Sequence, residues 1–157
     1  MFTYITPCLP DWLDYNGHMN DACYGRVFSD AIDAMMDDIG LDAAYRARTK
    51  GTLYTVEDHR WYEQEVRAGA ALEVQTLVLD FDAKRLHIWQ GLFVAAQRCA
   101  ACETMLLHIS QAGEAPKAAP LPAGVQAVLG EHQAAYQAAH GAEAPLKPRA
   151  ARLGLRR

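Results

Sequence analysis

The sequence predicts an α+β domain in which an antiparallel sheet wraps around one long helix. Apolar residues recur at helical spacing from about residue 21 to Ile39. After Gly51 the pattern changes to four strand-like segments, at about 53–66, 71–81, 85–95 and 98–110. The connections between these segments are short, which favours an antiparallel meander. One long apolar helix followed by a meander predicts a sheet packed against that helix.

The long helix is also predicted by the residues at its ends. Asn16-Gly17 is a strong turn signal, because both residue types tolerate a positive φ angle. Asn20 or Asp21 then makes a good N-cap, and Gly40 is typical of a C-cap. The apolar face of this helix comprises Tyr24, Val27, Phe28, Ala31, Ile32, Met35 and Ile39.

Two shorter segments complete the main domain, which we place at residues 1–112. Residues 2–13 predict an extended N-terminal segment that is interrupted by Pro7 and Pro10. Residues 42–49 predict a short helix capped by Asp42.

Beyond Gly113 the composition shifts to Ala, Pro and Gln, so we expect residues 113–157 to form a C-terminal extension. A helix near 123–139 is predicted within it, because apolar residues recur there at helical spacing. A basic tail follows, which can either contact phosphates or lie free in solvent. Its charged residues are Lys147, Arg149, Arg152, Arg156 and Arg157.

The composition is that of one ordinary globular domain. The 157 residues are enough for one domain and hardly two, and 51% are hydrophobic against 22% charged. The net charge of −4 provides no basic field for nucleic acid, and no run approaches the roughly 20 apolar residues of a membrane span. Because the N-terminus lacks the pattern of a signal peptide, we expect a cytoplasmic protein that binds neither nucleic acid nor membrane.

The four cysteines fit that compartment. Cys99-Ala-Ala-Cys102 has the CxxC spacing, but it lies in a predicted strand, where residues three apart point to opposite faces. No second CxxC or histidine pair completes a zinc set. We therefore interpret these cysteines as small buried hydrophobes and expect no metal site.

The stretch Asp14-Tyr15-Asn16-Gly17-His18-Met19-Asn20 is the strongest candidate for chemistry. It places a carboxylate, an imidazole and an amide around a tight turn at the start of the predicted helix. A carboxylate can attack an acyl carbon or activate water, and helix N–H groups can bind a developing oxyanion. This combination is suited to acyl transfer.

Each of these residues also has a structural interpretation, and the residue pattern leaves both open. Asp14 is ionised near neutral pH and can act as nucleophile or base, or it can form an Asx-turn with Asn16. His18 can orient Asp14 or the substrate, or it can complete the turn. Asn20 is expected to cap the helix in either case.

A helix after a D-x-x-G-H-x-N turn, followed by a meander, resembles the hotdog-fold acyl-CoA thioesterases of the 4-hydroxybenzoyl-CoA thioesterase-like group. The resemblance covers residues 3–111, and it implies that Asp14 is the catalytic carboxylate and that amides near Asp21 to Cys23 polarise the thioester carbonyl. It also implies a homodimer or homotetramer with the site at a subunit interface, an acyl-CoA substrate, and neither metal nor separate cofactor. The chain departs from many relatives at Gly69-Ala70, where they have a glycine–aspartate pair.

Within that group, three strings resemble the thioesterases linked to carnitine breakdown, whose substrate is betainyl-CoA. They are Trp12-Leu-Asp-Tyr-Asn-Gly-His-Met-Asn-Asp21, Ala83-Lys84-Arg85-Leu86-His87 and Met105-Leu-Leu-His108. The resemblance implies a small acyl group, and betainyl-CoA is the substrate that it favours. Such a substrate calls for side chains that hold a trimethylammonium group and for basic side chains that hold the phosphates of CoA.

The candidates for these roles fall into two sets. Aromatic faces and nearby carboxylates attract a quaternary cation, whereas basic residues at turns and strand ends can meet phosphates. Trp12, Trp61, Tyr62 and Trp89 are the aromatic candidates, and each of them is also typical of core or interface packing. The substrate-binding candidates are Tyr24, Glu57, His59, Trp61 and Tyr62, and the CoA-binding candidates are Arg67, Lys84 and Arg85.

Two other functions remain compatible with a hotdog fold. A hydratase is disfavoured, because the G-D-x-N-P-x-H pattern that is typical of hotdog hydratases is absent from this sequence. A non-enzymatic module that only binds acyl-CoA is not excluded by any residue. The sequence does not determine which acyl group is bound or whether the protein is a dimer or a tetramer. It also leaves open whether Asp14 acts as a nucleophile or as a general base.

Overall fold

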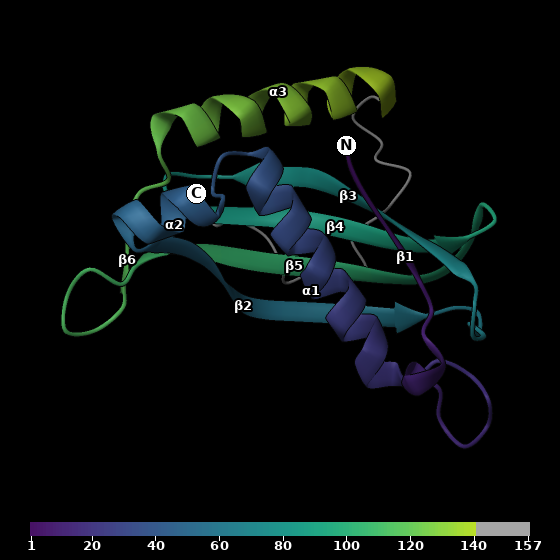
Figure 1. Ribbon diagram of the computed structural model, residues 1–157. Helices are drawn as coiled ribbons and strands as arrows, with labels where there is room; N and C mark the ends of the chain where they lie inside the picture. The colour runs from purple at the N-terminus through teal and green to yellow at the C-terminus, as the bar shows by residue number, and fades with distance from the viewer. Residues whose placement is uncertain (141–157) are drawn as a thin grey trace.

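The computed structural model describes residues 1–140, which form a curled antiparallel sheet around one long helix (Figure 1). The chain runs through β1 (Phe2–Pro7), a 3-10 turn (Pro10–Trp12), α1 (Asp21–Asp38), α2 (Ala43–Thr49), β2 (Gly51–Tyr62), β3 (Ala71–Phe81), β4 (Arg85–Val94), β5 (Gln97–Ser110), β6 (Lys117–Ala118) and α3 (Ala123–His140). The predicted α+β architecture is confirmed. The predicted basic tail lies outside the described residues.

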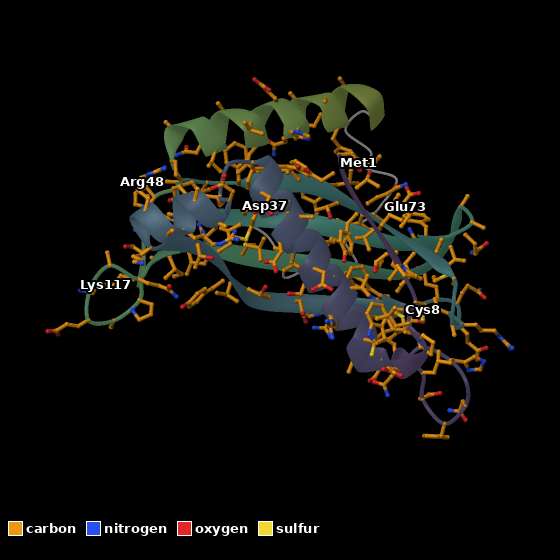
Figure 2. The ribbon with its side chains drawn as sticks, in the orientation of Figure 1. Met1, Cys8, Asp37, Arg48, Glu73 and Lys117 are labelled. Carbon is orange, nitrogen blue, oxygen red and sulfur yellow. The ribbon has the colours of Figure 1, made fainter. Side chains whose placement is uncertain are left out.

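The helix α1 begins and ends as its sequence predicts. The Asn20 side chain caps it by accepting the backbone N–H of Ala22 at 3.0 Å, and Gly40 follows its end with a φ of +86°. The predicted apolar face is buried against the sheet, and side chains fill the space between them (Figure 2). This buried face fixes the position of α1 along the sheet.

The strand order corrects the predicted meander. The order is β1-β3-β4-β5-β2, so only β3, β4 and β5 follow one another, and β2 pairs with β5 rather than with β3. The edge beside β3 is taken by β1, part of the segment predicted only as extended. Sequence-adjacent strands usually pair, which is why the meander was the expected arrangement.

The difference arises at residues 63–70. The strand β2 ends at Tyr62, before the predicted end at 66, and residues 63–70 then cross the sheet to reach β3, which lies between β1 and β4. The crossing is held by its backbone: Glu63 N–H donates to the Cys99 carbonyl, and the Val66 carbonyl accepts the N–H of Met19 at 2.7 Å. The Val66 side chain is buried in the core. The crossing segment therefore lies directly against the turn that precedes α1.

The two faces of the sheet have different neighbours. Gln90 lies on the face toward α1, where its amide donates to the Phe28 carbonyl at 3.1 Å. The opposite, outer face carries Trp89 and Leu77, against which Tyr136 of α3 packs. The helix α3 was predicted near 123–139, and its Leu129 also enters the α1 side of the core. Among residues 1–140, none of the helices combines the length and apolarity needed to cross a membrane.

Candidate active site

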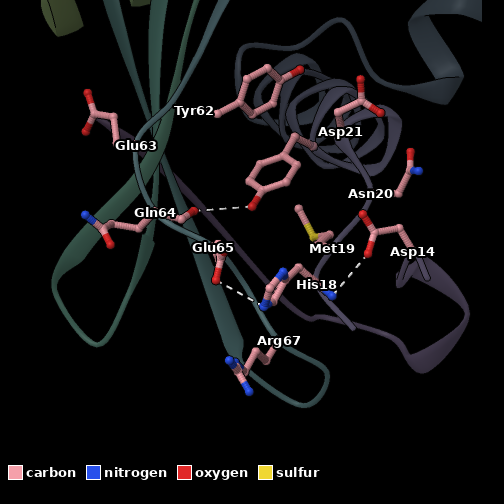
Figure 3. Close-up of a pocket in the computed structure, with 11 residues that line it drawn as sticks. Asp14, His18, Met19, Asn20, Asp21, Tyr62, Glu63, Gln64, Glu65 and Arg67 are labelled. Atoms are coloured by element: carbon pink, nitrogen blue, oxygen red, sulfur yellow. Dashed lines mark hydrogen bonds and ion pairs between the residues drawn. The ribbon is translucent and has the colours of Figure 1, made fainter. Parts of the chain in front are cut away.

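A cleft of about 710 Å³ lies where the turn before α1 faces the crossing segment (Figure 3). One wall comes from residues 14–24 and the other from residues 62–67, and the two walls are joined by the hydrogen bond between Met19 and Val66. The predicted residues Asp14, His18, Asn20, Tyr24, Tyr62 and Arg67 line this cleft. Segments far apart in the sequence are thus brought together at one end of α1.

Asp14 is held in the cleft by an Asx-turn. Its Oδ1 atom accepts the backbone N–H of Asn16 at 2.8 Å and that of His18 at 3.4 Å, while Gly17 takes a φ of +77° that favours glycine. Desolvation acts to raise the pKa of the Asp14 carboxyl, but the hydrogen bonds from Asn16 and His18 outweigh it and hold that pKa below its ordinary value. The carboxylate is therefore ionised at neutral pH.

The first turn of α1 provides fewer free N–H groups than the resemblance implies. The Ala22 N–H donates to the side chains of Asn20 and Asp21, and the Cys23 N–H donates to the Asn20 carbonyl. Among the residues that the structure describes, the N–H of Asp21 has no acceptor. This amide, at the positive end of the helix dipole, is the group available to bind an oxyanion.

His18 contacts a residue that the sequence analysis did not single out. Its Nε2 atom lies 3.0 Å from Oε2 of Glu65 in the crossing segment (Figure 3). Glu63 and Gln64, which the sequence analysis also did not name, line the cleft with it. No local signal could have found these residues, because their place depends on where β2 ends.

Two tyrosines form the apolar part of the cleft. The rings of Tyr24 and Tyr62 meet edge to face, with centroids 5.2 Å apart. Tyr24 is buried and its hydroxyl donates to the Gln64 carbonyl at 3.4 Å. Burial raises the pKa of Tyr24 to about 12, so the hydroxyl stays protonated at neutral pH. Half of Tyr62 is exposed toward the cleft.

The other predicted substrate-binding residues lie elsewhere in this chain. Glu57 and His59 share a face of β2 and form an exposed pair at 3.2 Å. Trp61 lies with them on the outer face, where it packs beside Trp89. Asp58 and Arg60 occupy the positions between them and face α1. The period of two thus separates these three residues from Asp14 within the chain.

The predicted CoA-binding pair at the β3–β4 turn also lies apart from the cleft. Lys84 and Arg85 are at the end of the sheet opposite to Asp14, separated by roughly 30 Å, the length of the ten-residue strand β4. Arg85 is bound to Asp82 by two hydrogen bonds of 2.8 and 2.5 Å, whereas Lys84 is exposed. A 340 Å³ depression adjoins both.

Comparison with known proteins identifies the family to which this fold and cleft belong. The sequence profile of the Thioesterase-like superfamily matches residues 8–129, a span that includes the cleft. The chain belongs to this superfamily. The expected relationship to thioesterases and the expected hotdog fold are thereby confirmed. Thioesterases that act on CoA thioesters are hydrolases.

Individual relatives of this thioesterase-like chain sharpen the comparison. It is 43% identical over 148 residues to the betainyl-CoA thioesterase of Pseudomonas aeruginosa, covering 82% of this chain and 93% of that protein. It is 46% identical over 99 residues to the L-carnitine dehydrogenase/betainyl-CoA thioesterase of Agrobacterium fabrum, but it spans only 20% of that longer protein.

Solved structures of related proteins have the same fold. A Pseudomonas putida KT2440 protein described as a thioesterase superposes with a TM-score of 0.80 at 38% identity, covering 100% of this chain and 97% of that one. A Staphylococcus aureus protein solved in complex with CoA superposes with a TM-score of 0.78 at 28% identity, covering 85% and 84%.

Proposed function

We propose that the protein hydrolyses a small acyl-CoA thioester to the free acid and CoA. The observation that carries this proposal is the ionised Asp14 carboxylate, held in a cleft beside the first turn of α1. Asp14 attacks the thioester carbon or deprotonates a water, and the N–H of Asp21 stabilises the oxyanion that develops on the carbonyl. The reaction consumes only substrate and water, so it calls for no separate cofactor.

We further propose betainyl-CoA as the substrate. The relative with 43% identity is a betainyl-CoA thioesterase, and the charge of the cleft supports a cationic acyl group. Four of its lining side chains are carboxylates, and within residues 1–140 only Glu63 among them is paired with an arginine, Arg98, at 2.8 Å. The exposed ring of Tyr62 provides the aromatic contact that a trimethylammonium group favours.

We propose that two copies of the chain pair through β2. This interface is compatible with a homodimer and with a homotetramer built from two such pairs. β2 is an edge strand, and proteins commonly cover such edges. Pairing two copies of β2 antiparallel about a two-fold axis places the Lys84 end of one sheet beside the Asp14 end of the other. Lys84 and Arg85 of one subunit would then lie near the cleft of its partner, where CoA phosphates extend from the thioester.

Free thiols support a cytoplasmic location for this enzyme. All four cysteines are free, and Cys99 and Cys102 are both buried in the strand β5. Unpaired cysteines are typical of proteins in reducing compartments.

The decisive experiment compares two thioesters of the same shape. Betainyl-CoA carries a trimethylammonium group, and 3,3-dimethylbutyryl-CoA carries a neutral tert-butyl group in its place. We expect CoA release from both, with kcat/KM at least tenfold higher for betainyl-CoA, because only the cation is attracted by the carboxylates and by Tyr62. Equal rates would overturn the betainyl assignment but keep the thioesterase. CoA release from neither, nor from acetyl- or aromatic thioesters, would favour the acyl-CoA-binding module instead.

A further inference from the structure

The imidazole of His18 is held between two walls of the cleft. The backbone N–H of His18 donates to Oδ1 of Asp14 at 3.4 Å, and the Nε2 atom of its ring lies 3.0 Å from Oε2 of Glu65. The side chain of His18 is about three-quarters buried and lines the cleft, whereas that of Glu65 is 68% exposed. One ring thus connects the catalytic turn to the crossing segment.

The backbone around Glu65 is anchored on both sides, so the carboxylate has a defined origin. Gln64 N–H donates to the Cys99 carbonyl at 3.0 Å on one side. On the other side Val66 is buried and its carbonyl accepts the N–H of Met19, the residue next to His18. The two residues of the pair are therefore held by adjacent backbone bonds rather than by two free loops.

A carboxylate that accepts the Nε2–H of a neutral histidine determines its tautomer. The proton stays on Nε2, and Nδ1 is left with a lone pair that can accept a hydrogen bond from water or substrate. Without that carboxylate, the ring is free to turn about its side-chain torsions and to exchange tautomers. The contact therefore sets both the orientation of the ring and the hydrogen-bonding role of its second nitrogen.

We propose that Glu65 is a positioning residue that fixes the tautomer and the orientation of His18 within the cleft. The proposal rests on the proposed thioester hydrolysis, in which His18 orients the attacking water or the thioester beside Asp14. Glu65 touches neither reacting atom and acts on the chemical step through His18, beside its contribution to the charge of the cleft.

The exposure of Glu65 separates this role from a structural one. A charged hydrogen bond this exposed contributes little to stability, because solvent screens it. A stabilising function would therefore be weak, whereas a positioning function depends only on geometry. Loss of Glu65 is expected to change turnover and the histidine tautomer while leaving the thermal midpoint almost unchanged.

The test uses Glu65→Ala and Glu65→Gln in the full chain. The alanine variant removes the acceptor, and the glutamine variant retains an oxygen that can accept the Nε2–H. With the neutral 3,3-dimethylbutyryl-CoA as substrate, we expect kcat to fall about tenfold in Glu65→Ala with KM changed less than twofold, and to recover at least half of that loss in Glu65→Gln. The fall is a part of the roughly 10²- to 10⁴-fold that positioned proton transfer contributes.

A spectroscopic signature accompanies the kinetics. Nitrogen-15 NMR distinguishes protonated from unprotonated ring nitrogens, and the His18 signals are identified by their loss in His18→Gln. We expect the Nε2–H tautomer in the wild type and in Glu65→Gln, and a mixture in Glu65→Ala. Asp37→Ala is the matched control, because it removes a similarly exposed carboxylate from an ion pair with Arg46 at the far end of α1.

The outcomes separate this inference from the proposed function. A wild-type chain that hydrolyses no thioester overturns the proposed function. The tautomer of His18 can still be measured in that case, and an unaltered tautomer in Glu65→Ala overturns the positioning role. In an active enzyme, Glu65→Ala with wild-type kcat and wild-type tautomer overturns the proposal. An equal loss of kcat in Asp37→Ala would also overturn it, because the effect would then be unspecific.

Discussion

The Oδ1 atom of Asp14 accepts the backbone N–H of Asn16 at 2.8 Å, so the carboxylate that faces the cleft also closes the turn. The structural and the catalytic interpretations of Asp14 are therefore compatible. One oxygen is engaged by the turn, and the other has only a 3.4 Å contact with the Asn16 amide. The turn fixes the direction of the carboxylate relative to α1.

Asp14→Asn is expected to lower kcat by at least about 10²-fold, because an amide is neither a base nor a nucleophile at neutral pH. Its carbonyl oxygen can still accept the Asn16 N–H, so the turn and the thermal midpoint should be preserved. CoA release and a thermal melt measure the two effects. Asp30→Asn, which removes a carboxylate paired with Arg26 on α1, is the control. Retention of more than half the wild-type rate in Asp14→Asn would exclude a catalytic carboxylate.

The pH profile should follow the lowered pKa of Asp14. Because hydrogen bonds hold this pKa below the unfolded value of about 3.9, activity should be independent of Asp14 titration from pH 5 to 7 and fall only at lower pH. The corresponding contribution to stability is present above the unfolded pKa and is lost as pH falls through the folded one. Initial rates in Asn16→Ala, which lacks one of these hydrogen bonds, should show an acid limb shifted to higher pH. An unshifted or lower limb would contradict this origin of the pKa.

Val56→Lys should dissociate a dimer formed through β2. Val56 is an exposed aliphatic residue on this edge strand, and two lysines facing each other across a two-fold axis repel. Sedimentation velocity should show monomers, with kcat falling in proportion to the dimer lost. Ile5→Lys places the same charge on an exposed aliphatic residue of the other edge strand, β1, and should leave the assembly intact. Dissociation by Ile5→Lys alone would move the interface to β1.

Lys84→Ala should raise KM about fivefold without changing kcat, because a single partly screened charge contact with phosphate is worth on the order of 1 kcal/mol. Arg85→Ala should have a smaller effect, since Asp82 already binds the Arg85 guanidinium. Steady-state kinetics at low and high salt test both, and the Lys84 effect should shrink in salt. Lys84→Arg preserves the charge and should preserve KM. A lowered kcat with unchanged KM would contradict phosphate binding.

Glu103→Ala should destabilise the fold by about 3–5 kcal/mol, because it leaves His87 without its partner in a buried pair. The two side chains meet at 2.8 Å and are 0% and 6% exposed. Urea unfolding measures the change, with kcat per folded molecule expected to stay near the wild-type value. Glu57→Ala breaks the exposed pair with His59 and should cost less than about 1 kcal/mol. Equal costs in the two variants would show that burial does not govern these pairs.

Local chemistry determined a large part of this protein from the sequence. The periodicity of α1, the Asn20 cap and the glycines at its turns depend on near neighbours along the chain, and each was predictable. The same holds for the strands β3 to β5, whose connections are too short for any other pairing. The placement of Asp14 beside the start of α1 follows from these local elements.

Only the tertiary structure decided the second wall of the cleft and the pairing of β2. Whether residues 63–70 turn back or cross the sheet depends on long-range packing of Val66 against the core, which leaves no local pattern. That crossing brings Glu65 to His18, and the register of β2 against β5 places Glu57 and His59 on the outer face. Sequence thus determined the geometry of the Asp14 carboxylate, which we propose to be catalytic, because that geometry is made by adjacent residues. The wall that faces this carboxylate, with Glu63, Gln64 and Glu65, was decided by the fold, because that segment meets the turn only when the core is formed.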